Sequence, residues 1–396
     1  MDQMDFTRRF LLKSVGAAGL VGATSSLGLS RAFAADPLRI WTIGVAKVGA
    51  EPGTGGKDWG DMGAQAGIDI VYNAKSGSAD QAIQKFVVGD GNDLYDAITD
   101  NGGGMEDALA SQSAITALDT AQIPNFANII DAYKDGGDAA STIRYDDTIY
   151  AIPYISNADS LAFDFEEVGE ELTSWEACFA PEFKGRVALQ NDFGPTFTNT
   201  AIYLKQSGQL DIADPSDMTA DEVAGVAEFL ITKKQEGQFR TFWDGFQNGV
   251  DLLSSGEVLL QSCWEPVQIV AAKKAGKDIR YGTMKEGHQT WNNIWMLTNG
   301  GDERGQAEAF YKLMNLYLDP WFGARIIATY GYQPQMTGVM DYIDSSPDFS
   351  EEMKAVIAER RERQQARYAV PGNSWQNVFP TEIRAYQDWW SKVQSA

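Results

Sequence analysis

The sequence is poor in the residues that metal sites and many catalytic sites require. Among 396 residues there is one histidine, His288, and there are two cysteines, Cys178 and Cys263. A single histidine excludes a site with several histidine ligands, and it allows a serine, histidine and aspartate triad only if His288 is the base. No GxSxG, HExxH or GxxxxGK[ST] motif occurs. These absences argue against an enzyme, a metal site and any other cofactor.

Positive charge is also scarce. The chain has 32 lysines and arginines against 55 aspartates and glutamates, which gives a formal net charge of −23. Such a charge repels nucleic acids and anionic lipids, and it concentrates cations near the protein surface. We therefore expect no nucleic-acid partner.

Long hydrophobic runs are missing as well. The apolar stretch 15–29 is diluted by glycine and is shorter than the roughly 20 residues that span a bilayer. The segment TRRFLLK at 7–13 precedes it, and Ala32-Phe33-Ala34 follows it as a small-x-small cleavage site. We expect residues 1–34 to be a twin-arginine export signal. In an oxidising compartment Cys178 and Cys263 can form a disulfide or stay as two buried thiols, and both alternatives are open.

The remaining length suits two domains, and its patterns are those of an α/β protein. Residues 38–43 and 68–72 alternate as strands do, and residues 95–98 form a third run. This third run leads into Gly102–Gly104 and a helix that begins at Met105. A strand, a glycine turn and a helix form the unit of an α/β sheet, whose ligands sit at the strand ends.

The glycine turn at Gly102–Gly104 has two interpretations. Its backbone N–H groups could hold an anion at the start of the helix. Alternatively, the turn is tight so that a ligand can approach the backbone. We favour the second, because Glu106 and Asp107 already place negative charge in the first helical turn.

Residues 262–295 hold two clusters of aromatic and polar residues, Trp264-Glu265-Pro266 and Trp291-Asn292-Asn293. Tryptophan faces attract cations, and a neighbouring carboxylate adds charge complementarity. This pattern predicts the wall of a small-molecule cleft that prefers an organic cation. The alternative is that both tryptophans are core packing, since tryptophan is highly buried on average.

Several short motifs follow one another in an order that resembles a known family. They are Ile152-Pro153-Tyr154, Thr173-Ser174-Trp175, Pro181–Gly185, Gly256-Glu257-Val258, Trp264, Lys285-Glu286-Gly287, Tyr330-Gly331-Tyr332 and Trp375-Gln376-Asn377. The order and spacing are similar to those of bacterial extracellular solute-binding proteins, specifically the spermidine/putrescine-binding periplasmic proteins of ABC importers. The resemblance runs from about Leu38 to the C-terminus.

The resemblance implies a two-lobed α/β clamshell of the type II periplasmic-binding-protein class, in which crossing hinge strands join the lobes and the ligand lies between them. It also implies a periplasmic location, an ABC permease as partner and no enzymatic activity. Combined with the placement of prolines, it predicts crossings near Pro153, Asn293 and Pro334. We expect lobe one to comprise residues 36–153 plus 294–333, and lobe two residues 154–293 plus 334–396.

The resemblance also implies a set of binding residues. Asp192 matches an acidic ligand contact of the polyamine binders. Aromatic and amide contacts are matched by Trp264, Trp291, Tyr332 and Gln376.

This chain departs from the family pattern at two acidic positions. Pro195 and Asn293 stand where the relatives have acidic residues, and Glu265 is a candidate replacement beside Trp264. The site therefore provides well for one cation, since an unpaired buried charge is costly. We expect a small cationic or zwitterionic amine of the polyamine type.

Three alternatives are weighed against this amine receptor. Tryptophan platforms also suit a carbohydrate-binding receptor, and the glycine turn suits an anion-binding one. An exported hydrolase would use paired carboxylates such as Asp244 and Glu265, but little of the required constellation can be named. Otherwise Asp244 is expected to be an ordinary surface residue.

Overall fold

The computed structural model describes residues 36–42, 62–75, 79–376 and 379–396, and its contacts divide the chain into residues 1–36 and residues 37–396. The description below concerns the second unit. The expected export signal, residues 1–34, lies outside the described residues. In the part of the chain that is described, no helix has the length and apolar character needed to cross a membrane.

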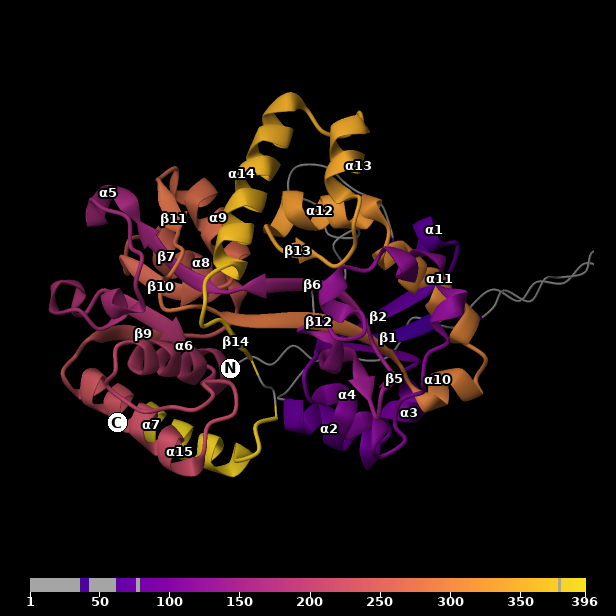
Figure 1. Cartoon of the computed structure of the whole chain (residues 1–396), viewed down its shortest axis with the longest axis horizontal. Coiled ribbons are helices and arrows are strands. Elements are labelled where there is room, and N and C mark those ends of the chain that lie inside the picture. The colour runs from indigo at the N-terminus through magenta and orange to yellow at the C-terminus, as the bar shows by residue number, and fades with distance from the viewer. Residues whose placement is uncertain (1–35, 43–61, 76–78, 377–378) are drawn as a thin grey trace, which may run out of the picture. The chain divides into compact units, whose positions relative to one another are not determined.

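The larger sheet has seven strands within the described residues and defines the first lobe (Figure 1). The strands are β1 (Leu38–Thr42), β2 (Ile70–Ala74), β3 (Ala97–Asn101), β6 (Ile152–Ala158), β12 (Gln289–Leu297), β13 (Gln333–Pro334) and β14 (Ser374–Trp375). Their order is β13-β6-β12-β3-β1-β2, and β14 pairs with β12. β1 is parallel to β2 and β3, whereas β12 is antiparallel to β3 and β6. The carboxyl ends of β1, β2 and β3 therefore meet at one edge.

Helices and short turns cover this sheet. The helices are α1 (Met62–Ala66), α2 (Ala79–Val87), α3 (Gly91–Leu94), α4 (Met105–Ala110), α10 (Asn299–Glu303), α11 (Ala307–Tyr317) and α12 (Pro320–Tyr330), and α13 (Val339–Ser345) packs on α12. Between α4 and β6 the chain forms the 3-10 turns η2 (Thr120–Gln122), η3 (Pro124–Asn128), η4 (Asp131–Tyr133) and η5 (Ala140–Ile143), and the hairpin β4 (Arg144–Tyr145) and β5 (Thr148–Ile149). Apolar side chains on both sheet faces, such as Ile40 and Ile98, are buried in two separate clusters.

A five-stranded sheet in the described residues defines the second lobe. Its strands are β7 (Ser160–Asp164), β8 (Val187–Gln190), β9 (Phe239–Trp243), β10 (Leu260–Cys263) and β11 (Ile279–Tyr281), in the order β11-β7-β10-β8-β9. The surrounding helices are α5 (Phe165–Val168), α6 (Phe193–Gln206), α7 (Ala220–Gln235), α8 (Phe246–Ser254), α9 (Glu265–Ala275) and α15 (Ile383–Ser395), with 3-10 turns η6 (Trp175–Cys178) and η7 (Pro181–Phe183). α7 begins with a capping box in which Thr219 and Glu222 bond each other's backbone. The predicted two-lobed α/β fold is confirmed.

The chain changes sheet at points that differ from the expected crossings. β6 stays paired with β12 as far as Ala158, so the first change falls at Asp159 rather than at Pro153. Pro153 fits inside β6 because the register shifts opposite it, between Asn293 and Ile294, where a ladder hydrogen bond is not required. The chain returns between β11 and β12, and it leaves the first sheet again after β14. The residue ranges assigned to the two lobes stay a prediction.

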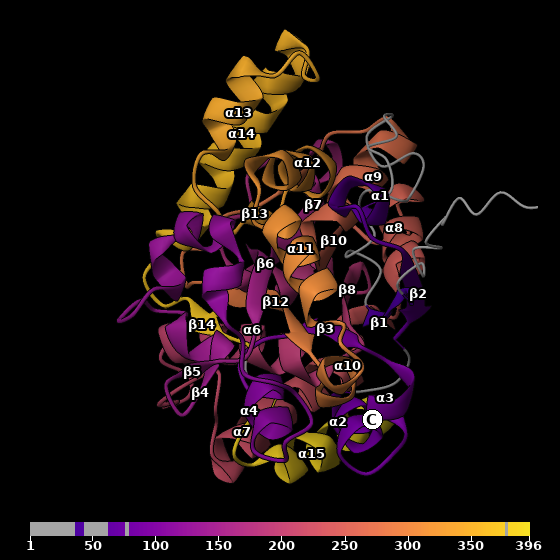
Figure 2. The same ribbon diagram turned by 90° about the vertical axis from the view of Figure 1, so that its right-hand side faces the viewer.

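A helical pair extends beyond both sheets. α13 and the long α14 (Glu351–Tyr368) stand together at the top of Figures 1 and 2. The last turn of α14 returns to the crossing region, where Arg367 Nε donates a 3.0 Å hydrogen bond to the carbonyl oxygen of Ala158. α14 therefore contacts the strand that leads into the second lobe.

Candidate binding site at the strand ends

Three neighbouring parallel strands of the second lobe end at the same edge. β8 lies between β9 and β10 and is parallel to both, with Gln190 paired to Trp243 at the last position. Asp192, Asp244 and Trp264 follow β8, β9 and β10 within two residues. Because the carboxyl ends of parallel strands share one edge, these three side chains belong to one region, which is where α/β sheets bind ligands.

Asp192 is the predicted acidic contact, and it has a structural role as well. It is the N-cap of α6, and its Oδ1 accepts a 2.9 Å hydrogen bond from the N–H of Gly194. Among the described residues, its other oxygen accepts no hydrogen bond, and the side chain is exposed. Desolvation by the surrounding protein nevertheless raises the pKa of Asp192. A carboxylate that water reaches while protein surrounds it is suited to a cleft.

Asp244 was not among the ligand contacts expected from the sequence, yet it follows the strand next to that of Asp192. Asp244 is exposed. Desolvation is the largest cause of the raised pKa of Asp192; the negative charge of Asp244 adds to it, and the positive charge of Lys75 on the first lobe opposes it. The two carboxylates therefore lie within electrostatic range of each other. The signal was available, since Asp244 directly follows a strand as Asp192 does.

Trp264 keeps part of its surface accessible. It is half-buried at the N-cap position of α9, and its ring lies 5.1 Å from that of Trp243 at 88°. Trp243 is buried, and its Nε1–H donates a 2.9 Å hydrogen bond to the carbonyl oxygen of Ser262. Trp243 thus packs edge to face against Trp264, at the sheet edge that Asp192 and Asp244 also follow.

Glu265, in contrast, is committed to the interior. It is fully buried and forms an ion pair with Arg367, which is equally buried. Burial raises the pKa of Glu265, and the Arg367 charge opposes this shift. Gly331 packs so closely that a Cβ there would lie 2.8 Å from the Glu265 carboxyl carbon. Glu265 was expected to contact the ligand, but here it joins α9 to α14.

Trp291 and Tyr332 are the two aromatic residues that the resemblance implied as ligand contacts on the first-sheet strands and after α12. They contact each other and are both buried. Their rings lie 5.1 Å apart at 87°, with exposed fractions of 7% and 5%. Trp291 Nε1–H donates a 2.8 Å hydrogen bond to Asp159 Oδ2. Tyr332 also stacks on half-buried Tyr330 at 5.7 Å. The pair lies at the crossing, because Trp291 belongs to β12 and its partner Asp159 lies between β6 and β7.

Gln376 lies between the surroundings of this pair and the start of α6. Its Oε1 accepts a 3.0 Å hydrogen bond from Gln289 Nε2, which also donates to Asp159 at 3.2 Å. The Gln376 amide nitrogen lies 3.0 Å from the place that a Cβ on Gly194 would take, beside the start of α6. A side chain at residue 194 would therefore displace Gln376.

Asn293 lies on the first-lobe side of the region. It is 3% exposed, and its Nδ2 donates a hydrogen bond to Asn101 Oδ1 at the end of β3. Asn293 is therefore held by the first sheet rather than by residues of the second.

The glycine turn does not offer free donors. The N–H groups of Gly103 and Gly104 donate to both carboxylate oxygens of Glu106, at 3.0 to 3.3 Å. The group that approaches the turn is Trp375, whose Nε1 would lie 2.4 Å from a Cβ on Gly103. The N–H groups that an anion would need are therefore already bonded to Glu106. The group that comes close to the turn is the side chain of Trp375 rather than a ligand.

Neither a metal centre nor a disulfide occurs in the described residues. They contain no group of three or more histidine, cysteine, aspartate or glutamate side chains able to hold a metal ion. Cys178 and Cys263 are both buried free thiols, and they belong to different apolar clusters.

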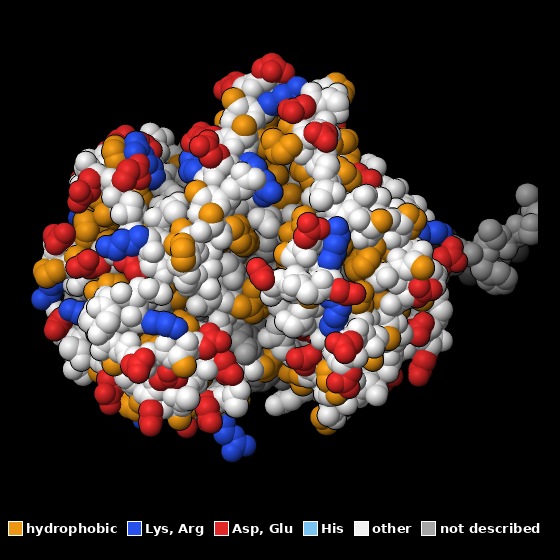
Figure 3. All heavy atoms as spheres, in the orientation of Figure 1, with side chains coloured by type: hydrophobic (Ala, Val, Ile, Leu, Met, Phe, Trp, Pro, Cys, Tyr) orange, Lys and Arg blue, Asp and Glu red, His pale blue; other side chains and the backbone are white. Residues whose placement is uncertain are grey.

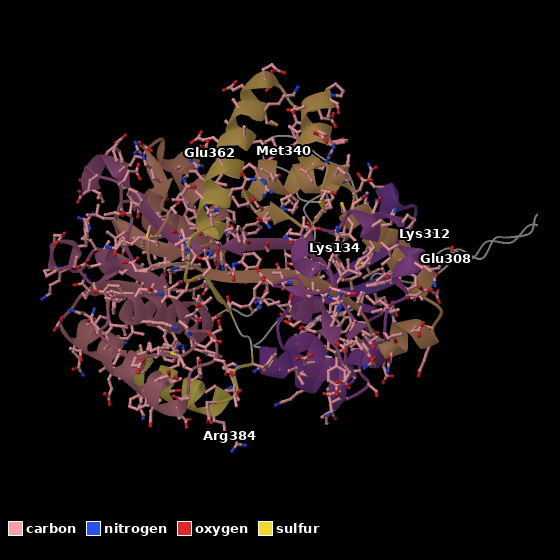
Figure 4. All side chains as sticks on the ribbon, viewed as in Figure 1. Lys134, Glu308, Lys312, Met340, Glu362 and Arg384 are labelled. Atoms are coloured by element: carbon pink, nitrogen blue, oxygen red, sulfur yellow. The ribbon has the colours of Figure 1, made fainter. Side chains whose placement is uncertain are left out.

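A pocket of about 430 Å³ lies elsewhere, on the first lobe. Its lining includes Gln65 of α1 and the ion-paired Glu308 and Lys312 of α11, which Figure 4 shows near one side of the molecule. None of the predicted site residues lines it. The strand ends of the second lobe, which Asp192, Asp244 and Trp264 follow, therefore stay the candidate binding site.

Fold and site together define a two-lobed solute-binding protein. The chain belongs to the bacterial extracellular solute-binding protein family, whose sequence profile matches residues 61–355.

Three proteins exemplify the similarity of this chain to others in sequence or in fold. The spermidine/putrescine-binding periplasmic protein of Escherichia coli (strain K12) is 22% identical over 333 residues, which cover 84% of this chain and 86% of that protein. A putative spermidine/putrescine ABC transporter protein from Listeria monocytogenes has a similar structure, with TM-score 0.68 and 16% identity over 90% of this chain and 98% of that one. A GABA receptor has TM-score 0.62 and 13% identity over 91% and 98% of the two chains.

Proposed function

We propose that the protein is the receptor of an ABC importer that captures a small cationic or zwitterionic amine between its lobes and delivers it to a membrane permease. Family membership supports the binding role, and the relatives named above supply the amine class. Their ligands carry ammonium groups, alone in the polyamines and with a carboxylate in GABA.

The observation that carries the amine assignment is the pair of carboxylates beside a tryptophan. Asp192 and Asp244 follow neighbouring strands, and the Trp264 ring stands after the next strand of the same sheet. An ammonium group here gains charge-assisted hydrogen bonds and a cation–π contact. Acidic side chains are also spread over the face shown in Figure 3, and the net charge of −23 favours the approach of cations.

The proposal includes delivery to the periplasm by the twin-arginine route, with residues 1–34 as the signal. It also includes closure of the two lobes on the ligand, with β6 and β12 as the hinge. A reporter protein fused behind residues 1–34 tests the route. Export should require Arg8 and Arg9, and replacing both by lysine should abolish it.

The ligand class is tested by thermal denaturation of residues 35–396 in the presence of monoamines, diamines, ω-amino acids, sugars and dicarboxylates. A ligand that binds only the native state raises the melting temperature, with a free energy of RT ln(1 + [L]/Kd). Stabilisation by amines and not by sugars or dicarboxylates is the expected result. Stabilisation by sugars or dicarboxylates alone would overturn the proposal.

A further inference from the structure

The first lobe carries its own cation at the edge where β1, β2 and β3 end. Thr42 at the end of β1 pairs with Ala74 at the end of β2, and Lys75 is the next residue. Asp100 lies in β3, the other neighbour of β1, one residue before the strand ends. The strand register thus brings a lysine and an aspartate to one edge of the sheet, as the second lobe brings Asp192 and Asp244 to its own edge.

Lys75 occupies a site built from a carboxylate and a tryptophan. Its Nζ forms an ion pair with Asp100 Oδ2 and lies 5.8 Å from the centroid of the Trp41 ring. The side chains of Lys75 and Asp100 are only 11% and 3% exposed. The other Asp100 oxygen accepts a 2.8 Å hydrogen bond from the N–H of Asn101, which fixes the carboxylate. These are the groups that bind an alkylammonium ion, and the protein's own side chain fills the place.

The lysine also acts on the opposite lobe. Its positive charge lowers the pKa of Asp192, although desolvation dominates and the net shift is upward. Lys75 and Asp192 are therefore within electrostatic range, so that a second ammonium group brought toward the first lobe would meet a like charge.

We propose that Lys75 is a resident ammonium group that determines specificity: it fills the cation site of Asp100 and Trp41, so the ligand places one ammonium at Asp192 and Asp244 and none on the first lobe. This inference rests on the proposed function and narrows it to ligands with a single ammonium group. Such ligands include simple monoamines and ω-amino acids.

The test is calorimetric titration of residues 35–396 and of Lys75→Met with n-alkylmonoamines and with α,ω-diamines of three to six carbons. In the unmodified chain a second ammonium should bring no gain. In Lys75→Met the Asp100 carboxylate loses its lysine partner. The affinity for a diamine of suitable length should then rise about tenfold or more, while the affinity for monoamines changes by less than about threefold.

Three further variants control for structural effects. Lys85→Met removes a lysine with an aspartate partner, Asp90, and a ring at 5.4 Å, but lies on α2 away from the strand ends, so no gain is expected. Lys75→Gln repeats the loss of charge with a side chain that can still donate to Asp100. Lys75→Met combined with Asp100→Asn removes both charges and so leaves no unpaired buried carboxylate. This double variant should lack the increase in diamine affinity.

The outcomes separate the two proposals. Binding of monoamines without any diamine gain in either Lys75 variant overturns the role of Lys75 but leaves the amine receptor intact. Tighter binding of diamines by the unmodified chain has the same meaning. If neither chain binds any amine, the proposed function fails, and the inference fails with it.

Discussion

The indole N–H of Trp291 donates a 2.8 Å hydrogen bond to the carboxylate of Asp159, the residue at which the chain passes from the first sheet to the second. The backbone oxygen of Asp159 is 3.0 Å from His288 Nδ1, and His288 Nε2 accepts from the N–H of Met284 at 3.1 Å. The neutral histidine therefore carries its proton on Nδ1 and donates to Asp159. Trp291 and His288, the only histidine of the sequence, therefore both bond to the residue between the two sheets.

Trp264 is expected to report ligand binding by fluorescence, and Trp291 is not. Trp264 is half-buried at the strand ends, whereas Trp291 is 7% exposed and already bonded at its nitrogen. Closure of the lobes on an amine should change the surroundings of Trp264 most. Titration of Trp264→Phe and Trp291→Phe with the best amine checks this. The signal should disappear in the first variant and persist in the second; the reverse pattern contradicts the assignment.

Asp159→Asn is expected to remove a pH dependence of stability. Burial raises the pKa of Asp159 from 3.8 to about 7. Between these values the native protein holds a proton that the unfolded chain has lost. The free energy of unfolding therefore falls as pH rises through this window, by up to about 1.4 kcal/mol per pH unit. The asparagine variant lacks this contribution.

Urea denaturation of both proteins across this pH range measures the effect. His288 contributes the opposite slope, because burial lowers its pKa from 6.5 to about 3 and the unfolded chain binds the extra proton. That contribution is common to both proteins, so the difference in unfolding free energy isolates Asp159. A difference that does not vary with pH contradicts the prediction.

A single substitution that breaks the ion pair of Glu265 and Arg367 is expected to cause a large loss in the free energy of unfolding. Both side chains are fully buried, and removing one leaves the other unpaired in the interior. Arg367→Met should therefore lower the free energy of unfolding by about 3 to 5 kcal/mol. Combining it with Glu265→Gln should recover much of this loss. Denaturation of the two single variants and the double variant forms the test cycle, and simple additivity would show that the pair is not coupled.

Patterns in the sequence predicted the fold well, whereas the binding residues stay a prediction. Strand alternation from Leu38, the capping box at Thr219 and the glycine turn after β3 are local signals, and the structure contains each of them. Asp192 lies two residues after β8, where it caps α6. In these cases the structure depends on a few adjacent residues.

Other features depend on contacts between distant segments. The pairing of Glu265 with Arg367 spans 102 residues, and no local pattern at residue 265 distinguishes a buried carboxylate from an exposed one. The capture of Lys75 by Asp100 likewise requires the register of β1, β2 and β3. Pro153 lies inside β6 rather than at the change of sheet, opposite a register shift between β6 and β12 that no pattern around residue 153 predicts.

Asp192 and Asp244 are expected to share one ammonium group of the ligand, so each substitution by asparagine should weaken binding. Asparagine is an effective N-cap, and Asp192→Asn therefore keeps the start of α6 while removing the charge. Loss of a charge-assisted hydrogen bond costs about 1.5 to 3 kcal/mol, or roughly 10- to 100-fold in Kd. Asp244→Asn should cost about tenfold, contrary to the effect expected of an ordinary surface residue.

Asp251→Asn provides the matched control, because Asp251 lies on α8, soon after Asp244, loses the same formal charge and pairs with Lys274 at the surface. Its effect on Kd should stay within about threefold, or about 0.6 kcal/mol. Calorimetric titration of the three variants with the same amine decides the assignment. If Asp192→Asn and Asp251→Asn bind equally well, the carboxylate at the end of β8 is only a helix cap. Equal losses in all three variants would instead mean that net charge attracts the ligand and that neither strand-end carboxylate contacts it.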